Sequence, residues 1–128
     1  LESVDLSGLD TSEVKSMGDM FFGCSSLQSL DLFTLDTSSV TDYRSMFYGC
    51  SSLSTLDVSN FDTSRAMDMA LMFFDCSSLK ALDISSFDTS NVKEMFNMFS
   101  GCSSLEQFDA SYLDVSTAIL RLLFLGIS

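Results

Sequence analysis

The stretch LKALDISSFDTSNVKEMFNMFSGCSS, residues 79–104, decides the fold, because the rest of the chain repeats it with small changes. The other copies begin at Leu1, Leu27, Leu53 and Leu105, at a constant spacing with no insertion or deletion. A fixed period of this length is typical of a solenoid, and one repeat is too small to bury its own apolar face. The core must therefore lie between stacked repeats. We divide the chain into the repeats 1–26, 27–52, 53–78, 79–104 and 105–128.

The first part of each repeat predicts a short strand. Leu82 and Ile84 alternate with Ala81, Asp83 and Ser85, which is the pattern of a strand with one buried face. We expect Leu82 and Ile84 to point into the core and the other three residues to point outward. Equivalent strands of adjacent repeats would then form a parallel sheet, with about 4.8 Å between neighbours.

The second part of each repeat predicts a short helix. Its apolar positions follow helical spacing: Val92, Met95, Met98 and Phe99. Gly101 falls where a helix ends with a residue of positive φ, and Asp75 replaces this glycine in the third repeat. The predicted fold is an α/β solenoid of five strand-turn-helix repeats, with a parallel sheet on one face and right-handed connections.

The charge of the chain is strongly one-sided, with 18 acidic against 6 basic residues and a net charge of −12. This balance argues against nucleic acid and against an anionic lipid surface as partners. A basic patch on a protein would suit it, or the acidity simply keeps the protein in solution. No run reaches the ~18 apolar residues of a membrane span, and no signal peptide is visible at Leu1. Because the chain begins and ends within the repeat register, we expect it to be a fragment of a longer array.

The four cysteines fill the same position in successive repeats: Cys24, Cys50, Cys76 and Cys102. Stacked side chains point in parallel, whereas a disulfide needs side chains that point toward each other. Four thiolates in a column also do not converge on a point, as zinc requires. We therefore expect free, buried thiols that act as small core residues.

The motif L-D-L-S-x-F-D-T-S-x-V, followed by M-F-x-G-C-S-S-L, resembles the BspA-like leucine-rich repeats. Within them it is most similar to the Mycoplasma-type surface repeat of unknown function. The resemblance covers Leu1 to Ser104 in full and the fifth repeat, 105–128, in part. It implies a leucine-rich-repeat solenoid, a cell-surface or extracellular location, and a role in adhesion or protein–protein contact. It implies no cofactor and no catalytic residues.

A first aspartate column is expected to face outward from the strands: Asp5, Asp31, Asp57, Asp83 and Asp109. Like charges opposite each other destabilise a sheet, so something must offset their repulsion. Solvent screening, partial protonation with a raised pKa, a basic partner or a bound cation could each do so. A calcium ion wants six to eight oxygens, which a flat column of single carboxylates does not supply, so the metal interpretation ranks last.

A second aspartate column precedes the predicted helices: Asp10, Asp36, Asp62, Asp88 and Asp114. We expect these carboxylates to accept hydrogen bonds from backbone N–H groups at the start of each helix, which also lowers their pKa.

The outer face of the predicted helices loses polarity toward the C-terminus, from Lys15 and Asp19 to the apolar side chains of the fifth repeat. These candidate partner-binding residues are Ile119, Leu120, Leu122 and Leu123. Either further chain covers them, or a partner protein does. The second interpretation predicts self-association or packing into a larger complex.

Enzymatic activity is not expected, because the chain has no histidine, no cysteine with a candidate base and no phosphate-binding glycine loop. Two functions remain: a protein-interaction or adhesion module that binds a partner along its exposed strand face, and a structural subunit or spacer whose apolar C-terminal helix packs into a larger assembly. The predicted strand face is mostly small and polar, and Phe33 is its one large apolar residue and a further candidate for partner binding. We expect a surface protein–protein interaction role, with no cofactor.

Overall fold

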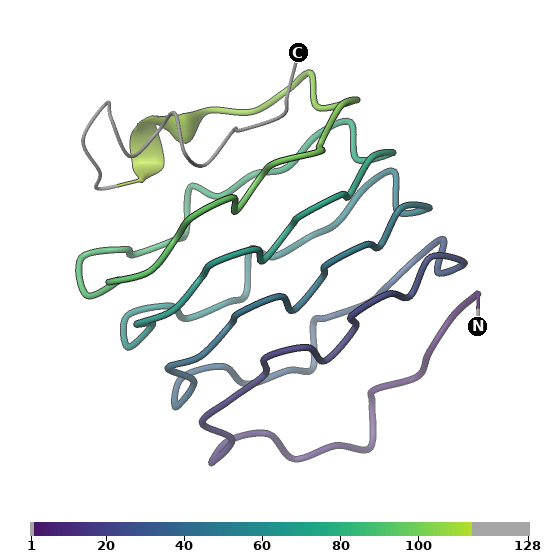
Figure 1. The fold of residues 1–128 in the computed structure, drawn as a ribbon. Helices are drawn as coiled ribbons and strands as arrows, with labels where there is room; N and C mark the ends of the chain where they lie inside the picture. Colours follow the sequence, from purple (N-terminus) through teal and green to yellow (C-terminus); the bar gives the residue numbers. More distant parts are fainter. Residues whose placement is uncertain (1, 114–128) are drawn as a thin grey trace.

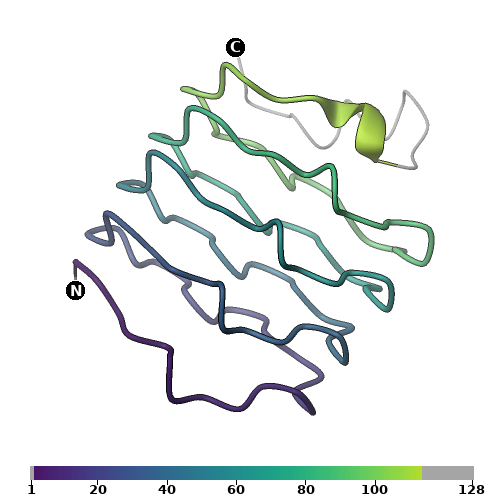
Figure 2. The same cartoon turned by 180° about the vertical axis from the view of Figure 1, so that it is seen from behind.

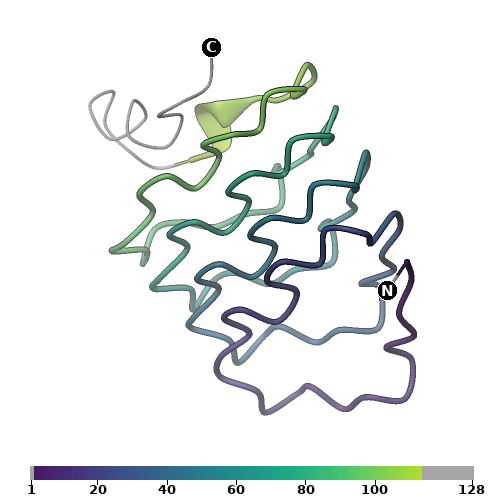
Figure 3. The ribbon, with the colours of Figure 1, turned by 45° about the vertical axis from the view of Figure 1, so that its right-hand side comes forward.

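The computed structural model describes residues 2–113 of the chain. The chain winds through successive coils that stack along one axis, as Figure 1 shows from one side and Figure 2 from behind. Seen from the side in Figure 3, each repeat lies directly against the next along the whole described chain. Two extended runs per repeat form opposite sides of the stack. This arrangement is the solenoid that the repeat period predicts.

We name the two sides by their residues. The strand side consists of the predicted strands, residues 28–33, 54–59 and 80–85 with their equivalents. The turn side consists of residues 15–23, 41–49, 67–75 and 93–101. Within residues 2–113 the one helix is the short 3₁₀ helix η1, Ala110–Tyr112, and the parallel pairing consists of isolated bridges.

The predicted alternation on the strand side is confirmed. Leu82 and Ile84 are buried, Asp83 and Ser85 are exposed, and Ala81 is half-buried. The predicted parallel sheet is reduced here to two bridges, which join Thr55 to Ala81 and Ala81 to Gln107.

Three parallel bridges instead lie on the turn side: Ser16 with Asp42, Asp42 with Asp68, and Asp68 with Glu94. The prediction of a parallel sheet on one face is therefore wrong in detail, because short parallel pairings join the repeats on both sides.

The predicted helix is wrong for the described repeats, and the backbone hydrogen bonds show why. Met17, Phe21 and Gly23 donate their N–H groups to carbonyls of the next repeat, at 2.7–2.9 Å. The N–H groups of Met20 and Phe22, by contrast, donate to the carbonyl three residues earlier. The chain thus makes consecutive β-turns, and each turn returns it to the core at the i, i+3, i+4 spacing that also characterises a helix.

Two positions of each turn-side run adopt a left-handed backbone. The prediction of positive φ at Gly101 and Asp75 is confirmed, with φ of +82° and 58°. Sequence reasoning missed the second position, four residues earlier, which holds Asp19, Ser45, Leu71 and Asn97 with φ between 52° and 62°. Each residue with positive φ reverses the path of the backbone, so that one β-turn can follow another. The residues of a right-handed helix all have negative φ, so a helix contains no such reversal.

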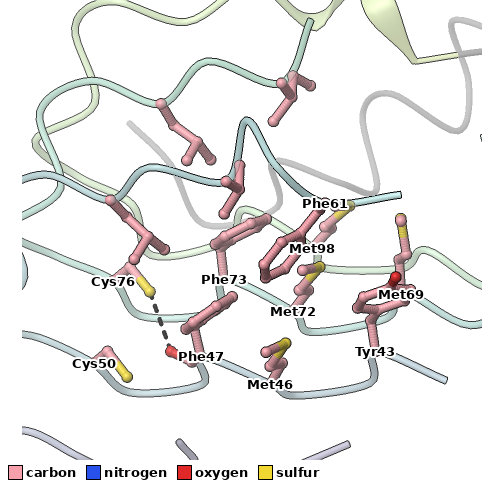
Figure 4. Close-up of a cluster of buried hydrophobic side chains, with 14 of the residues drawn as sticks. Tyr43, Met46, Phe47, Cys50, Phe61, Met69, Met72, Phe73, Cys76 and Met98 are labelled. Atoms are coloured by element: carbon pink, nitrogen blue, oxygen red, sulfur yellow. Dashed lines mark hydrogen bonds between the residues drawn. The ribbon is translucent and has the colours of Figure 1, made fainter. Parts of the chain in front are cut away.

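The core is a set of side-chain columns that run along the stack (Figure 4). Phe21, Phe47, Phe73 and Phe99 form a continuous stack, with 5.5–5.6 Å between ring centroids and planes within 9° of parallel. The methionines before these phenylalanines are buried beside them in the second to fourth repeats. The Met-Phe pairs are therefore core residues, as their spacing predicts.

The cysteines are free, and those of the second to fourth repeats are buried, which confirms the prediction for them, while Cys24 is half-buried. Each buried thiol donates to a phenylalanine carbonyl of the preceding repeat; Cys76, for example, lies 3.2 Å from the carbonyl of Phe47 (Figure 4). Burial raises the pKa of Cys50 and Cys102 to about 12. These thiols therefore hold repeats together and are not poised as nucleophiles.

Candidate interaction surfaces

Every described carboxylate of the first aspartate column closes a local turn. Its Oδ1 accepts the N–H of the residue two positions later, at 2.9 Å from Asp5 to Ser7 and 3.0 Å from Asp31 to Phe33. The other three make the same bond at 2.9 Å: Asp57, Asp83 and Asp109. This contact offsets part of the repulsion between neighbouring charges, an offset that sequence reasoning did not consider.

Protonation does not relieve the repulsion at four of the five carboxylates of this column. The serine two positions later lowers the pKa of Asp5, Asp57, Asp83 and Asp109 through hydrogen bonds. The effect of its side chain is the largest, and that of its backbone N–H comes second. The interpretation with a raised pKa is therefore wrong for these four residues. Residues 2–113 also contain no group of three or more Cys, Asp or Glu side chains placed to hold a metal ion.

The second aspartate column makes an even closer contact with the following serine. Asp62 accepts both the N–H of Ser64, at 3.1 Å, and its hydroxyl, at 2.7 Å. Asp10, Asp36 and Asp88 repeat this pair of bonds. These contacts lower the pKa of all four carboxyls. The predicted bond to a backbone N–H is confirmed, although it closes a turn and caps no helix, and Asp114 lies outside the described residues.

On the turn side, Arg44 reaches across two repeats. Its guanidinium forms an ion pair with Asp68 at 3.4 Å and lies 4.9 Å from the centroid of the Phe96 ring. Arg44, Ala70 and Phe96 occupy the same position in three successive repeats. The two large side chains therefore meet over Ala70, which is fully buried although its position faces outward.

A polar hollow of about 360 Å³ opens beside this cluster, where Gly18 has no side chain to fill the equivalent position. Its lining includes Asp19, Asp42 and Arg44. A larger and shallower groove of about 840 Å³ lies on the strand side of the last repeats, between Thr55 and Tyr112, with three carboxylates of the first aspartate column along it. Both hollows are acidic or mixed in charge.

The feature that sequence reasoning missed is an outer aromatic column on the turn side, formed by Phe22, Tyr48 and Phe74. The ring centroids are 4.5 Å apart in the first pair and 4.7 Å apart in the second, with planes 13° and 16° from parallel. Phe22 is 52% exposed, and the other two rings are half-buried. The signal was available, since an aromatic residue follows the Met-Phe pair in three successive repeats.

The candidates proposed from sequence for partner binding lie elsewhere. Phe33 is the most exposed large apolar residue of the described chain, at 78%, and it stands on the strand side. Ile119, Leu120, Leu122 and Leu123 lie outside the described residues. Within residues 2–113 no helix is long and apolar enough to cross a membrane.

Three solved structures resemble this fold. A leucine-rich cell-surface protein from Faecalibacterium prausnitzii is 22% identical, with a TM-score of 0.49 over 87% of this chain and 26% of that protein. A leucine-rich-repeat protein from Bacteroides ovatus is also 22% identical, with a TM-score of 0.48 over 80% of this chain and 29% of its own. A leucine-rich-repeat protein of T. pallidum is 20% identical, with a TM-score of 0.35 over 81% and 56% of the two chains. The chain thus spans just over a quarter of the first two proteins.

Sequence comparison gives the family. No curated protein matches the chain significantly. The family model described as "Mycoplasma protein of unknown function, DUF285" matches residues 2–56 and 15–120. These overlapping matches take in nearly all the repeats, and they confirm the resemblance carried by the repeat motif. The chain therefore belongs to the family of Mycoplasma proteins of unknown function DUF285.

Proposed function

We propose that this chain is a non-catalytic protein-interaction module of a surface protein, and that it binds its partner through the turn side. The outer aromatic column is the observation that carries the proposal. Interface hot spots are enriched in aromatic residues and arginine, and the turn side carries Phe22, Tyr48, Phe74 and Arg44. The exposed side chains of the strand side are mostly small, polar or acidic, apart from Phe33 and Lys80.

A non-catalytic role agrees with the chemistry of the side chains. The sequence has no histidine, the thiols of Cys50 and Cys102 have a pKa of about 12, and the described aspartates of the two columns are held in turns. A general base or an activated nucleophile would need a different environment. Adhesion is the specific form of this role that the family resemblance favours.

The alternative function is a structural subunit or spacer, which packs into a larger assembly through its C-terminal apolar residues. The sequence itself favours it: Ile119, Leu120, Leu122 and Leu123 follow one another with only Arg121 between them. A run of this kind is normally covered by protein.

Site-specific photo-crosslinking on the cell that makes the protein separates the two functions. A benzophenone amino acid would replace Tyr48 in one variant, Leu122 in a second and Ser85, on the strand side, in a control. The proposal expects one defined protein adduct from position 48 and none from position 85. Adducts from position 122 without any from position 48 would contradict it in favour of the structural subunit.

A further inference from the structure

We infer that the partner surface recognised by the outer aromatic column is a cationic amphipathic helix, lying along the axis of the solenoid. This inference rests on the proposed function and names the chemical class of the partner. It begins with what the column presents to solvent. Tyr48 has a neighbouring ring on each face, at 4.5 Å and 4.7 Å, so only its edge is open.

The open edges exclude flat ligands from the middle of the column. A sugar ring or a nucleobase binds an aromatic residue by lying against its free face. Here the facing surfaces of the three rings are covered by one another, and the planes are within 16° of parallel. The column therefore presents the narrow edges of three rings, apolar apart from the Tyr48 hydroxyl, and such edges suit the aliphatic side chains of a protein.

The length of the column favours a helix over a strand. The centroids of Phe22 and Phe74 are about 9 Å apart along the stack, from the two consecutive spacings. Three contacting side chains at i, i+3 or i+4, and i+7 of a helix span about 10 Å along its axis. Three side chains on one face of a strand span about 13 Å. The column ends in the fourth repeat, where the equivalent residue is the buried Ser100.

The charges select a basic partner. Asp19 lies one turn before Phe22, whose N–H donates to the Asp19 carbonyl, and Asp75 directly follows Phe74. A carboxylate thus stands close in sequence to each end ring of the column, and both residues are exposed. A second copy of this chain would bring another net charge of −12 against the first, and an anionic membrane would be repelled as well. Lysine or arginine beside an apolar stripe is complementary to this arrangement.

The test uses the whole chain and two fluorescent peptides of equal length, about five helical turns each, with the same leucine and lysine content. One peptide places leucine at helical spacing, and the other alternates leucine with lysine, as in a strand. Fluorescence anisotropy should show the helical peptide binding at least tenfold more tightly. Equal binding of both peptides would overturn the inference, because charge attraction alone would then explain the result.

Matched variants locate the site. Phe22→Ser with Tyr48→Ser and Phe74→Ser should weaken binding of the helical peptide at least tenfold, and the single variant Phe22→Ser, at an exposed position, should weaken it measurably if the triple variant unfolds. Leu9→Ser, at an apolar residue that is as exposed as Phe22 (52%) but lies outside the turn side, is the control and should bind normally. An equal loss in the control, or no loss in the column variants, would overturn the inference.

Charge variants and a sedimentation measurement complete the test. Asp19→Asn with Asp75→Asn keeps residues that tolerate the left-handed backbone at both positions, with φ of 60° and 58°. This variant should bind more weakly and with less dependence on salt. A wild-type dimer that the column variants dissociate would instead identify a second copy as the occupant and overturn the inference. If photo-crosslinking from position 48 captures a partner that the helical peptide does not displace, the proposed function stands and this inference fails.

Discussion

An exposed carboxylate such as Asp62 contributes to this fold through the turn that it closes. Its Oδ1 accepts two hydrogen bonds from Ser64, and the same geometry recurs in the first, second and fourth repeats. Backbone N–H groups in a turn are not hydrogen-bonded within a helix or a sheet. A nearby side chain can accept from them in place of water, and it loses little conformational freedom in doing so. The D-T-S motif is therefore a structural motif of the turn.

Replacing Asp62 by alanine should lower the free energy of unfolding by about 1 kcal/mol, because the N–H and the hydroxyl of Ser64 lose their acceptor. Asp62→Asn keeps an oxygen acceptor at the same place and should remain close to wild type. Urea denaturation measures both variants. An unchanged midpoint in the alanine variant would contradict this role.

The pH dependence of Asp62 has a definite sign. The serine contacts lower the pKa of this carboxyl in the folded chain below its ordinary value of 3.8. The stabilisation is therefore complete at pH values above 3.8 and is lost as the pH falls through the lower, folded-state pKa. The difference between the wild-type and Asp62→Ala midpoints should accordingly shrink in acid and stay constant between about pH 5 and pH 7.

Buried threonines join successive repeats. The Thr63 hydroxyl donates to the Asp88 carbonyl at 3.1 Å and accepts the Asp88 N–H at 2.8 Å, and Thr11 and Thr37 make the same pair of bonds one repeat apart. Thr63→Val keeps the shape but leaves both backbone groups without a partner, which should cost about 1–3 kcal/mol. Thr63→Ser keeps the hydroxyl and should lose less. A larger loss in Thr63→Ser than in Thr63→Val, measured by urea denaturation, would show that packing of the methyl group is what matters.

At the scale of the element, the sequence predicts which residues are buried better than it predicts their backbone. The constant repeat period, the alternation at Leu82 and Ile84 and the buried Met-Phe pairs all hold. The predicted helix does not hold, because apolar residues at i, i+3 and i+4 indicate only that the chain returns to the core at these positions. Consecutive β-turns and a helix return it equally often, and they differ in whether N–H groups bond within the repeat or to the next one.

Residue identity at the left-handed positions held the missing information. Asp19, Ser45 and Asn97 are short polar residues four positions before a glycine, which suits two reversals of the backbone better than one helix. In the third repeat this position holds Leu71, which breaks the pattern of short polar residues. The outer aromatic column was missed for a related reason. Helices of neighbouring repeats would lie about 8–10 Å apart, too far for Phe22, Tyr48 and Phe74 to stack at the observed 4.5 and 4.7 Å.

Leu71 adopts φ of 62°, a conformation that is costly for a residue with a bulky side chain. Leu71→Asn should therefore be more stable than Leu71→Ala by about 1 kcal/mol, because asparagine tolerates this conformation and alanine does not. The alanine variant is the control for the loss of leucine packing, which both variants share. Thermal unfolding of the two proteins checks the difference, and an alanine variant as stable as the asparagine variant would refute the strained backbone at this position.

Along the whole molecule, side chains of the same charge lie one above another at the spacing of the repeats. The charge of Asp57 raises the pKa of Asp83, and Asp36 acts in the same way on Asp62, although the serine hydrogen bonds outweigh these effects. Each repeat of a one-dimensional stack packs mainly against its neighbours, so distant parts of the chain do little to relieve this repulsion. Dissolved salt is then the main source of screening.

Asp83→Asn should consequently raise the thermal midpoint at low salt. The amide keeps an oxygen for the N–H of Ser85, which lies 2.9 Å from Asp83, while the charge that faces Asp57 is removed. At ~10 mM salt charges interact over about 30 Å, whereas at ~1 M they interact over about 3 Å, so the gain should vanish at high salt. Asp5→Asn is the matched control, since Asp5 makes the same turn with Ser7 and its pKa carries no such contribution from a neighbouring carboxylate. A gain at Asp83 that persists in ~1 M salt, or an equal gain at Asp5, would show that the amide stabilises the turn itself and that repulsion between repeats is negligible.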